Sequence, residues 1–153
     1  MEVQAKTKRE VLVSEYPGGE TYATRPFIYL GGAVDIGEDN HAWRHDPQVF
    51  GGLDVYCPIC MSNQSSDTSI IDSNMRALKV ATDAFFRLDS FSIGTPIEVW
   101  KRVMEWHLPA LLLTNSDGVF IREFLRRDGV EAIQQREQVR LVLIERLNAA
   151  DPF

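Results

Sequence analysis

Short apolar runs bounded by glycine, proline and polar residues recur along the chain, and longer segments with apolar residues at helical spacing lie between them. The short runs predict buried strands, and the helical spacing predicts helices. Strands are expected at 27–30, 53–56, 84–88 and 109–114. Helices are expected within 37–52 (ending near Asp46-Pro47) and over 71–82, 95–107, 119–127 and 130–148, with a polar loop over 61–70.

Strands that alternate with helices predict an α/β fold with a mainly parallel sheet and helices on both of its faces. In such sheets ligands bind beyond the carboxyl ends of the strands, so the loops that follow the strands are the places to look for a site. The segment before the first of these strands differs, because extended residues flank Pro17-Gly18-Gly19. We therefore expect an N-terminal hairpin or arm over 1–25 and a single domain over 26–153.

Composition places the chain among globular proteins. Its 153 residues are 44% hydrophobic and 25% charged, which argues against disorder and fits one domain. Two cysteines do not make a disulfide framework. No apolar run approaches the roughly 20 residues that cross a bilayer, and the N-terminus does not resemble a signal peptide. A soluble, cytoplasmic protein without membrane partners is expected.

The net charge of −6 is concentrated in residues 35–98, which hold ten acids against four bases. A protein that binds a nucleic acid polymer needs a basic surface to neutralise phosphates, so that class is disfavoured. The same negative field is expected to oppose a doubly charged 5′-phosphate and to suit a cationic sugar.

A tyrosine and a glutamate are expected to meet at one edge of the sheet. Tyr29 ends the first strand, and the third strand is expected beside it. Glu98 is placed in the first turn of the helix that follows the third strand, where acids are common because they complement the helix dipole. A carboxylate oriented by a phenol is also a nucleophile suited to a sugar carbon.

Several motifs resemble the nucleoside 2-deoxyribosyltransferase superfamily, which includes the deoxynucleoside 5′-monophosphate N-glycosidases. They are Tyr29-Leu30-Gly31-Gly32-Ala33-Val34-Asp35, Trp43-Arg44, Asp83 and, most specifically, Ser92-Ile93-Gly94-Thr95-Pro96-Ile97-Glu98. The resemblance covers about residues 26–115. It implies a flavodoxin-like α/β fold, no cofactor, and a homo-oligomer whose subunits share an active site.

The resemblance also implies roles for particular residues. Glu98 is the expected nucleophile and Tyr29 positions it; Asp72 or Asn74 holds the base, and Asn115 or Arg122 reaches the site from a partner subunit. Ala33 stands where the monophosphate hydrolases have a serine, which leaves Ser92 and Thr95 for a phosphate. The expected substrate-binding residues are Gly31, Asp35, Trp43, Asp72, Asn74, Asp83, Ser92, Gly94, Asn115 and Arg122.

The expected function is cleavage of the N-glycosidic bond of a 2′-deoxynucleoside, with transfer of the deoxyribosyl group to another base. The alternatives are a deoxynucleoside 5′-monophosphate N-glycosidase and a non-catalytic nucleotide-binding module. A thiol-redox protein built on Cys57 and Cys60 is a further alternative. A zinc site at these cysteines would need two more ligands, and His41, His45 and His107 show no paired spacing, so no metal is expected and the cysteines are interpreted as packing residues.

Overall fold

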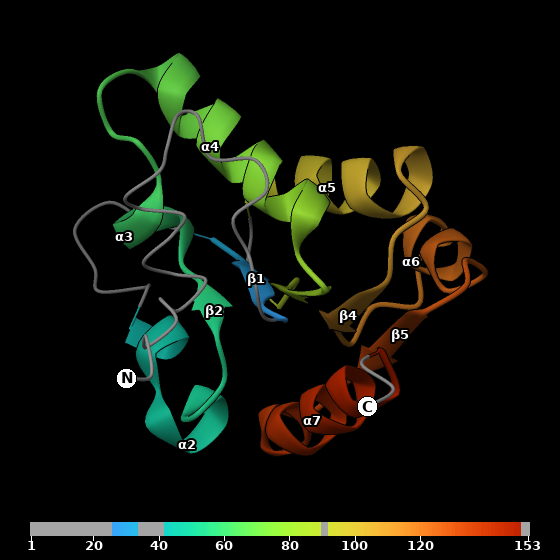
Figure 1. Cartoon of the computed structure of the whole chain (residues 1–153). Coiled ribbons are helices and arrows are strands. Elements are labelled where there is room, and N and C mark those ends of the chain that lie inside the picture. Colours follow the sequence, from blue (N-terminus) through green and yellow to red (C-terminus); the bar gives the residue numbers. More distant parts are fainter. Residues whose placement is uncertain (1–25, 34–41, 90–91, 151–153) are drawn as a thin grey trace.

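The computed structural model describes residues 26–33, 42–89 and 92–150 (Figure 1). The hairpin or arm predicted for 1–25, and Asp35, lie outside the described residues. Among the described residues, no helix has the length and apolar character needed to span a membrane.

The centre of the molecule is a five-stranded parallel sheet. Its strands are β1 (Ile28–Gly31), β2 (Val55–Tyr56), β3 (Asp83–Arg87), β4 (Ala110–Leu113) and β5 (Val130–Ile133). They are arranged in the order β2-β1-β3-β4-β5, and every neighbouring pair is parallel. This is the flavodoxin-like strand order, so the predicted α/β class is confirmed.

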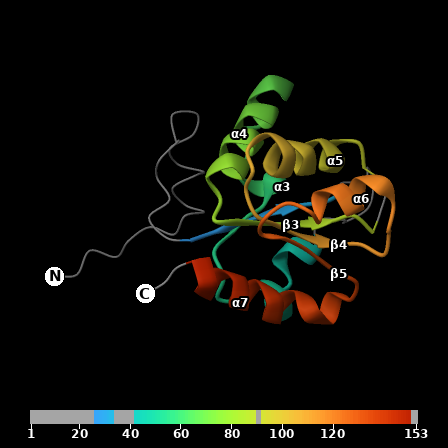
Figure 2. The ribbon, with the colours of Figure 1, turned by 90° about the vertical axis from the view of Figure 1, so that its right-hand side faces the viewer.

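Helices cover both faces of the sheet. The α-helices are α2 (Pro47–Phe50), α3 (Pro58–Met61), α4 (Asp67–Val80), α5 (Gly94–Val99), α6 (Val119–Phe124) and α7 (Val139–Ala150). The described residues also form two 3-10 turns, η1 (Ala42–His45) and η3 (Arg136–Gln138), and a π-helical stretch, η2 (Trp100–Glu105). Helices α3, α4, α5 and α6 lie on one side of the sheet and α7 on the other (Figure 2).

The alternation of side chains along β1 builds two cores. Tyr29 packs in the core under α4 and α5, with Leu78 and Val103, whereas Ile28 and Leu30 pack in the core that includes Leu143 of α7. Successive side chains of a strand point to opposite faces, so the sheet needs apolar residues at nearly every position. Tyr29 thereby faces the helix that carries Glu98.

The C-terminal prediction was wrong in one respect. Residues 130–133 form the edge strand β5 rather than the first turn of a long helix, and α7 begins at Val139. In β5 only Val130 and Ile133 are buried, a spacing of three that imitates a helix. The short strand therefore merged with the helical pattern that follows it.

Two helix boundaries also differ from the prediction. Asp46-Pro47 begins a helix rather than ending one, because the Asp46 side chain accepts a hydrogen bond from the Gln48 N–H and caps α2. Proline is favoured at the first position of a helix. Helix α4 starts at Asp67, inside the predicted loop, because the Ser66 side chain accepts a hydrogen bond from the Ser69 N–H.

Candidate functional site

The phenol of Tyr29 donates a hydrogen bond to a carboxylate oxygen of Glu98. Tyr29 lies in β1, two residues before the glycine that ends the strand, and Glu98 lies in α5, 69 residues further along the chain. Parallel pairing of β1 with β3 brings the two elements together, because α5 follows β3. The predicted juxtaposition is present. Glu98 is the fifth residue of α5, past the first turn where the helix dipole alone would explain an acid.

A cavity of about 590 Å³ opens above this pair. Its walls come from the loop after β1, the start of α3, one face of α4 and the first turns of α5. The lining residues are Gly32, Ala33, Arg44, Pro58, Ile71, Asn74, Met75, Ser92, Ile93, Gly94, Thr95, Ile97 and Glu98. The volume suits a small organic ligand, and the position is the one expected for ligands in this class of sheet.

Burial shapes the ionisation of the pair. The low-dielectric surroundings raise the pKa of Glu98 to about 7, and the Tyr29 hydrogen bond and the charge of Arg44 limit the rise. Burial, and next the Glu98 carboxylate, raise the pKa of Tyr29 well above its usual value. At neutral pH, Tyr29 is therefore a neutral donor beside a carboxyl group that changes charge near pH 7.

Arg44 was missed as a site residue and is the cation of the cavity. Its side chain is 1% exposed; Nε donates to the Leu30 carbonyl at 3.1 Å and one terminal nitrogen donates to the Gly32 carbonyl at 2.9 Å. Among the described residues, the other terminal nitrogen, buried as well, has no hydrogen-bond partner. The sequence offered no signal beyond the Trp43-Arg44 motif, since arginines are seldom fully buried.

Asn74, rather than Asp72, faces the cavity. Both lie on α4, but Asp72 is exposed and does not line the cavity, whereas the Asn74 side chain accepts a hydrogen bond from the Tyr56 hydroxyl at 3.1 Å. Tyr56 in turn stacks on Tyr29, with 5.5 Å between the ring centroids. Of the two residues that the sequence left open, Asn74 is therefore the one that lines the cavity, and its role toward a base stays a prediction.

The start of α5 is organised by Ser92. Its hydroxyl oxygen accepts hydrogen bonds from the Thr95 N–H at 3.2 Å and from the Thr95 hydroxyl at 3.0 Å. Gly94 lines the cavity beside it, with open space where a Cβ would be. Both predicted residues, Ser92 and Gly94, are thus at the cavity.

Gly31 and Trp43 lie close to the site but do not line the cavity. A Cβ on Gly31 would sit 2.4 Å from the Phe86 ring, so this glycine makes room for packing. Trp43 packs against Phe50 and Phe85 in the core on the α7 side of the sheet. Both residues contribute to the packing around the site, and neither lines the described cavity.

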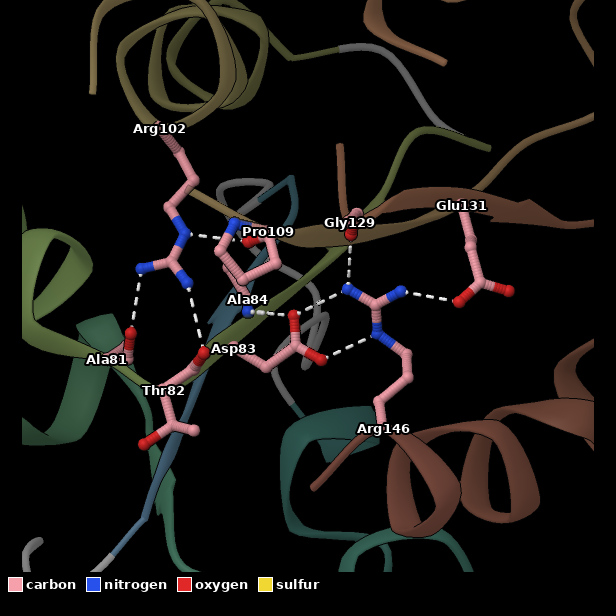
Figure 3. Close-up of polar contacts among 9 residues, drawn as sticks. All are labelled: Ala81, Thr82, Asp83, Ala84, Arg102, Pro109, Gly129, Glu131 and Arg146. Atoms are coloured by element: carbon pink, nitrogen blue, oxygen red, sulfur yellow. Dashed lines mark hydrogen bonds and ion pairs between the residues drawn. The ribbon is translucent and has the colours of Figure 1, made fainter. Parts of the chain in front are cut away.

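Asp83 lies at the opposite end of the sheet. It is the first residue of β3, and its carboxylate pairs with Arg146 of α7 at 2.7 and 3.0 Å (Figure 3). The sequence placed it among the substrate-binding residues, but the site lies at the carboxyl ends of the strands and Asp83 lies at the amino end. Its contacts are those of a structural ion pair.

A second buried arginine, Arg102, stabilises the end of the molecule where Asp83 lies. Arg102 donates to the carbonyls of Leu78, Ala81, Thr82 and Pro109, at distances between 2.6 and 3.3 Å. Figure 3 shows the bonds to Ala81, Thr82 and Pro109. These bonds connect the end of α4 with the residues that lead into β3 and β4. Burial lowers the pKa of Arg102 to about 10, which leaves it protonated at neutral pH.

Asn115 and Arg122 do not line the cavity that holds Glu98. Both are exposed, and Arg122 donates to the Asp117 carbonyl at 2.9 Å. The sequence predicts that one of these two residues reaches the site of a partner subunit, and that role stays a prediction.

Of the acids of residues 35–98 that the structure describes, Glu98 alone lines the cavity. Among the described lining residues, Glu98 is the one acid and Arg44 the one base. Asp83 pairs with Arg146, and Asp89 pairs with Arg87 and Arg136. The negative field predicted from composition is therefore not a property of the described cavity walls. One acid and one base on these walls do not oppose the binding of a 5′-phosphate in the way that the composition predicted.

No family model matches the chain, and no curated protein matches it significantly. The resemblance to the nucleoside 2-deoxyribosyltransferase superfamily consequently rests on the sequence motifs themselves.

The nucleophile that the sequence predicts at Glu98 gives a first testable prediction, the pH dependence of the expected glycosidic cleavage. A nucleophilic Glu98 must be ionised, so kcat/KM is expected to rise with pH through an apparent pKa of about 7 and to level off above it. A pH–rate profile on an unphosphorylated deoxynucleoside measures this. A profile that is flat from pH 5 to 9, or that falls through pH 7, would contradict the assignment.

Tyr29→Phe supplies a second prediction. Loss of the hydrogen bond is expected to lower kcat by about tenfold. It should also move the acid limb of the profile to higher pH, because that bond lowers the pKa of Glu98. The matched control is Tyr56→Phe, which removes a buried hydroxyl bonded to Asn74 instead; its acid limb should stay at about 7. Equal profiles for the two variants would make Tyr29 a packing residue.

Proposed function

We propose that this protein cleaves the N-glycosidic bond of a 2′-deoxynucleoside through Glu98 and transfers the deoxyribosyl group to another base. The observation that carries the proposal is the Tyr29–Glu98 hydrogen bond beneath a cavity at the carboxyl ends of β1 and β3. The resemblance of Tyr29–Asp35 and Ser92–Glu98 to the deoxyribosyltransferase motifs supports it independently of the geometry.

The first step is displacement of the base. A Glu98 carboxylate oxygen bonds to C1′ of the sugar, the C1′–N bond breaks, and its electron pair leaves with the base, which takes up a proton from solvent. Positive charge develops on the sugar in the transition state, and the nearby carboxylate stabilises it. Tyr29 holds the second carboxylate oxygen, so the attacking oxygen keeps one orientation.

The second step frees the enzyme. A nitrogen of the incoming base bonds to C1′ on the same face that the first base left, the ester bond to Glu98 breaks, and the incoming base loses a proton. Two inversions give net retention at C1′. Water in place of the second base would yield hydrolysis.

The test is a product assay with a panel of deoxynucleosides, each incubated with and without a different free base. Exchange of the base with retention supports the proposal, and release of base alone identifies a hydrolase. The absence of both products with every member of the panel would contradict the proposal and favour a binding module.

Hydrolysis of a deoxynucleoside 5′-monophosphate is a second candidate, and Arg44 favours it. A buried guanidinium with one nitrogen that has no partner among the described residues, beside the cavity, is suited to an anionic group, and arginine binds phosphate oxygens well. Measuring kcat/KM for a deoxynucleoside and for its 5′-monophosphate separates the candidates. A preference of tenfold or more for the monophosphate, lost in Arg44→Gln, would select the hydrolase.

We also propose that a second copy of the chain completes the site. A second cavity of about 570 Å³ adjoins the first and shares Ser92, Thr95 and Ile97 with it. Exposed Ile97, Trp100 and Phe120 line this second cavity, an arrangement that suits an apolar partner surface. Sedimentation is expected to give a dimer or larger species for the wild type and a smaller one for Phe120→Asp. A fully active wild-type monomer would contradict this arrangement.

A further inference from the structure

Three potential metal ligands from two separate loops lie together beside the cavity. His45 belongs to the turn that follows β1, and Cys57 and Cys60 flank and occupy the short helix that follows β2. Cys60 Sγ lies 3.4 Å from His45 Nε2 and 3.4 Å from Cys57 Sγ. The three ligand atoms all lie within 4.8 Å of one another.

The two separations of 3.4 Å are close to those around one tetrahedral ion. With Zn–S bonds of about 2.3 Å and Zn–N bonds of about 2.0 Å, tetrahedral ligand atoms lie roughly 3.5–3.8 Å apart. The two sulfurs are not joined, since a disulfide has its sulfurs about 2.05 Å apart and these are 3.4 Å apart. Two thiolates with an imidazole form a soft donor set that favours zinc over magnesium or calcium.

We propose that His45 Nε2, Cys57 Sγ and Cys60 Sγ bind one Zn²⁺ ion, with the fourth position left for water or an added ligand. Both cysteine thiols lose a proton when the ion binds, and no oxidant or reductant takes part. His45 and Cys60 are exposed, which gives the ion a path to the site. The site is independent of the glycosyl-transfer proposal.

The sequence did not indicate that His45 lies beside the two cysteines. His45 and Cys57 are separated by α2 and β2, and parallel pairing of β1 with β2 brings the loops that follow these strands to the same edge. The zinc connects these two loops. Their residues Arg44 and Pro58, each next to a ligand in the sequence, line the Glu98 cavity, so the metal holds one wall of that cavity in place.

The test uses the full chain without a histidine tag, stripped of metal and kept reduced by a phosphine. Competition for Zn²⁺ with a chromophoric chelator should give one ion bound per chain. Replacement by Co²⁺ should give the visible bands of a tetrahedral site and thiolate-to-cobalt charge-transfer bands. Binding well below one ion per chain, or a cobalt spectrum without charge transfer, would overturn the proposal whatever the variants do.

Cys60→Ser and His45→Gln should each weaken zinc binding by more than about 100-fold, because loss of an outer-shell partner alone costs about 10–100-fold. Both ligand residues are exposed, so the variants are expected to fold, and circular dichroism checks this. The matched control is His107→Asn, which removes a histidine outside the cluster; asparagine tolerates its positive φ of 54°. Equal zinc affinity for wild type, Cys60→Ser and His45→Gln would assign the bound metal to other residues.

Discussion

Replacing Glu98 with glutamine is expected to lower kcat/KM for glycosidic cleavage by at least ~100-fold. The amide keeps the size of the side chain and a hydrogen-bond acceptor for Tyr29. It lacks the negative charge that the proposed attack on C1′ requires. Steady-state kinetics on the best deoxynucleoside of the panel measure the loss. Near-native turnover in the folded variant would remove Glu98 from the mechanism.

The stability of the same variant provides an internal control. Burial raises the pKa of Glu98 from 4.5 to about 7, so its stabilising contribution is present below pH 4.5 and is lost as the pH rises through 7. Glu98→Gln carries no such charge and should therefore resist urea better than the wild type at pH 8, with the difference vanishing near pH 4.5. An inactive variant that is also less stable at pH 8 would show a folding defect instead.

Asp83→Asn is expected to destabilise the protein by about 3 kcal/mol, as breaking one partner of a buried ion pair does. The side chains of Asp83 and Arg146 are 5% and 11% exposed. Without the carboxylate, Arg146 retains Glu131 and the Gly129 carbonyl, and Arg102 loses the negative charge that favours its protonated form (Figure 3). Thermal unfolding should occur roughly 6–12 °C lower.

The matched control for Asp83→Asn is Glu105→Gln, which breaks the exposed pair with Lys101 and should change stability by less than about 1 kcal/mol. KM is expected to be unchanged in Asp83→Asn because the residue lies at the amino end of β3. A variant as stable as the wild type but with a raised KM would return Asp83 to the substrate-binding residues.

The sheet and the Tyr29–Glu98 pair were predictable because both follow from rules of chain topology. Apolar runs identified four of the five strands, and parallel pairing brings the ends of neighbouring strands to one edge. The short strand β5 was missed because its two buried residues are spaced as in a helix. The start of α4 was missed because the Ser66 cap stands among other serines.

The rest of the site could not be predicted from the sequence because it depends on the orientation of individual side chains. Asp72 and Asn74 are two positions apart on one helix, and only the exact start and rotation of α4 decide which one reaches the cavity. The roles of Arg44 and His45 depend on a turn of four residues whose neighbours are contributed by the loops after β1 and β2. No periodic pattern in the sequence reports such contacts.

The most direct test of the central claim is detection of the deoxyribosyl ester on Glu98. The protein is mixed with a deoxynucleoside, quenched with acid during turnover and digested, and the peptides are examined by mass spectrometry. The account predicts a mass increase of one deoxyribosyl group on the peptide that contains Glu98, lost in Glu98→Gln. Turnover without this adduct, or with the adduct on another residue, would contradict it.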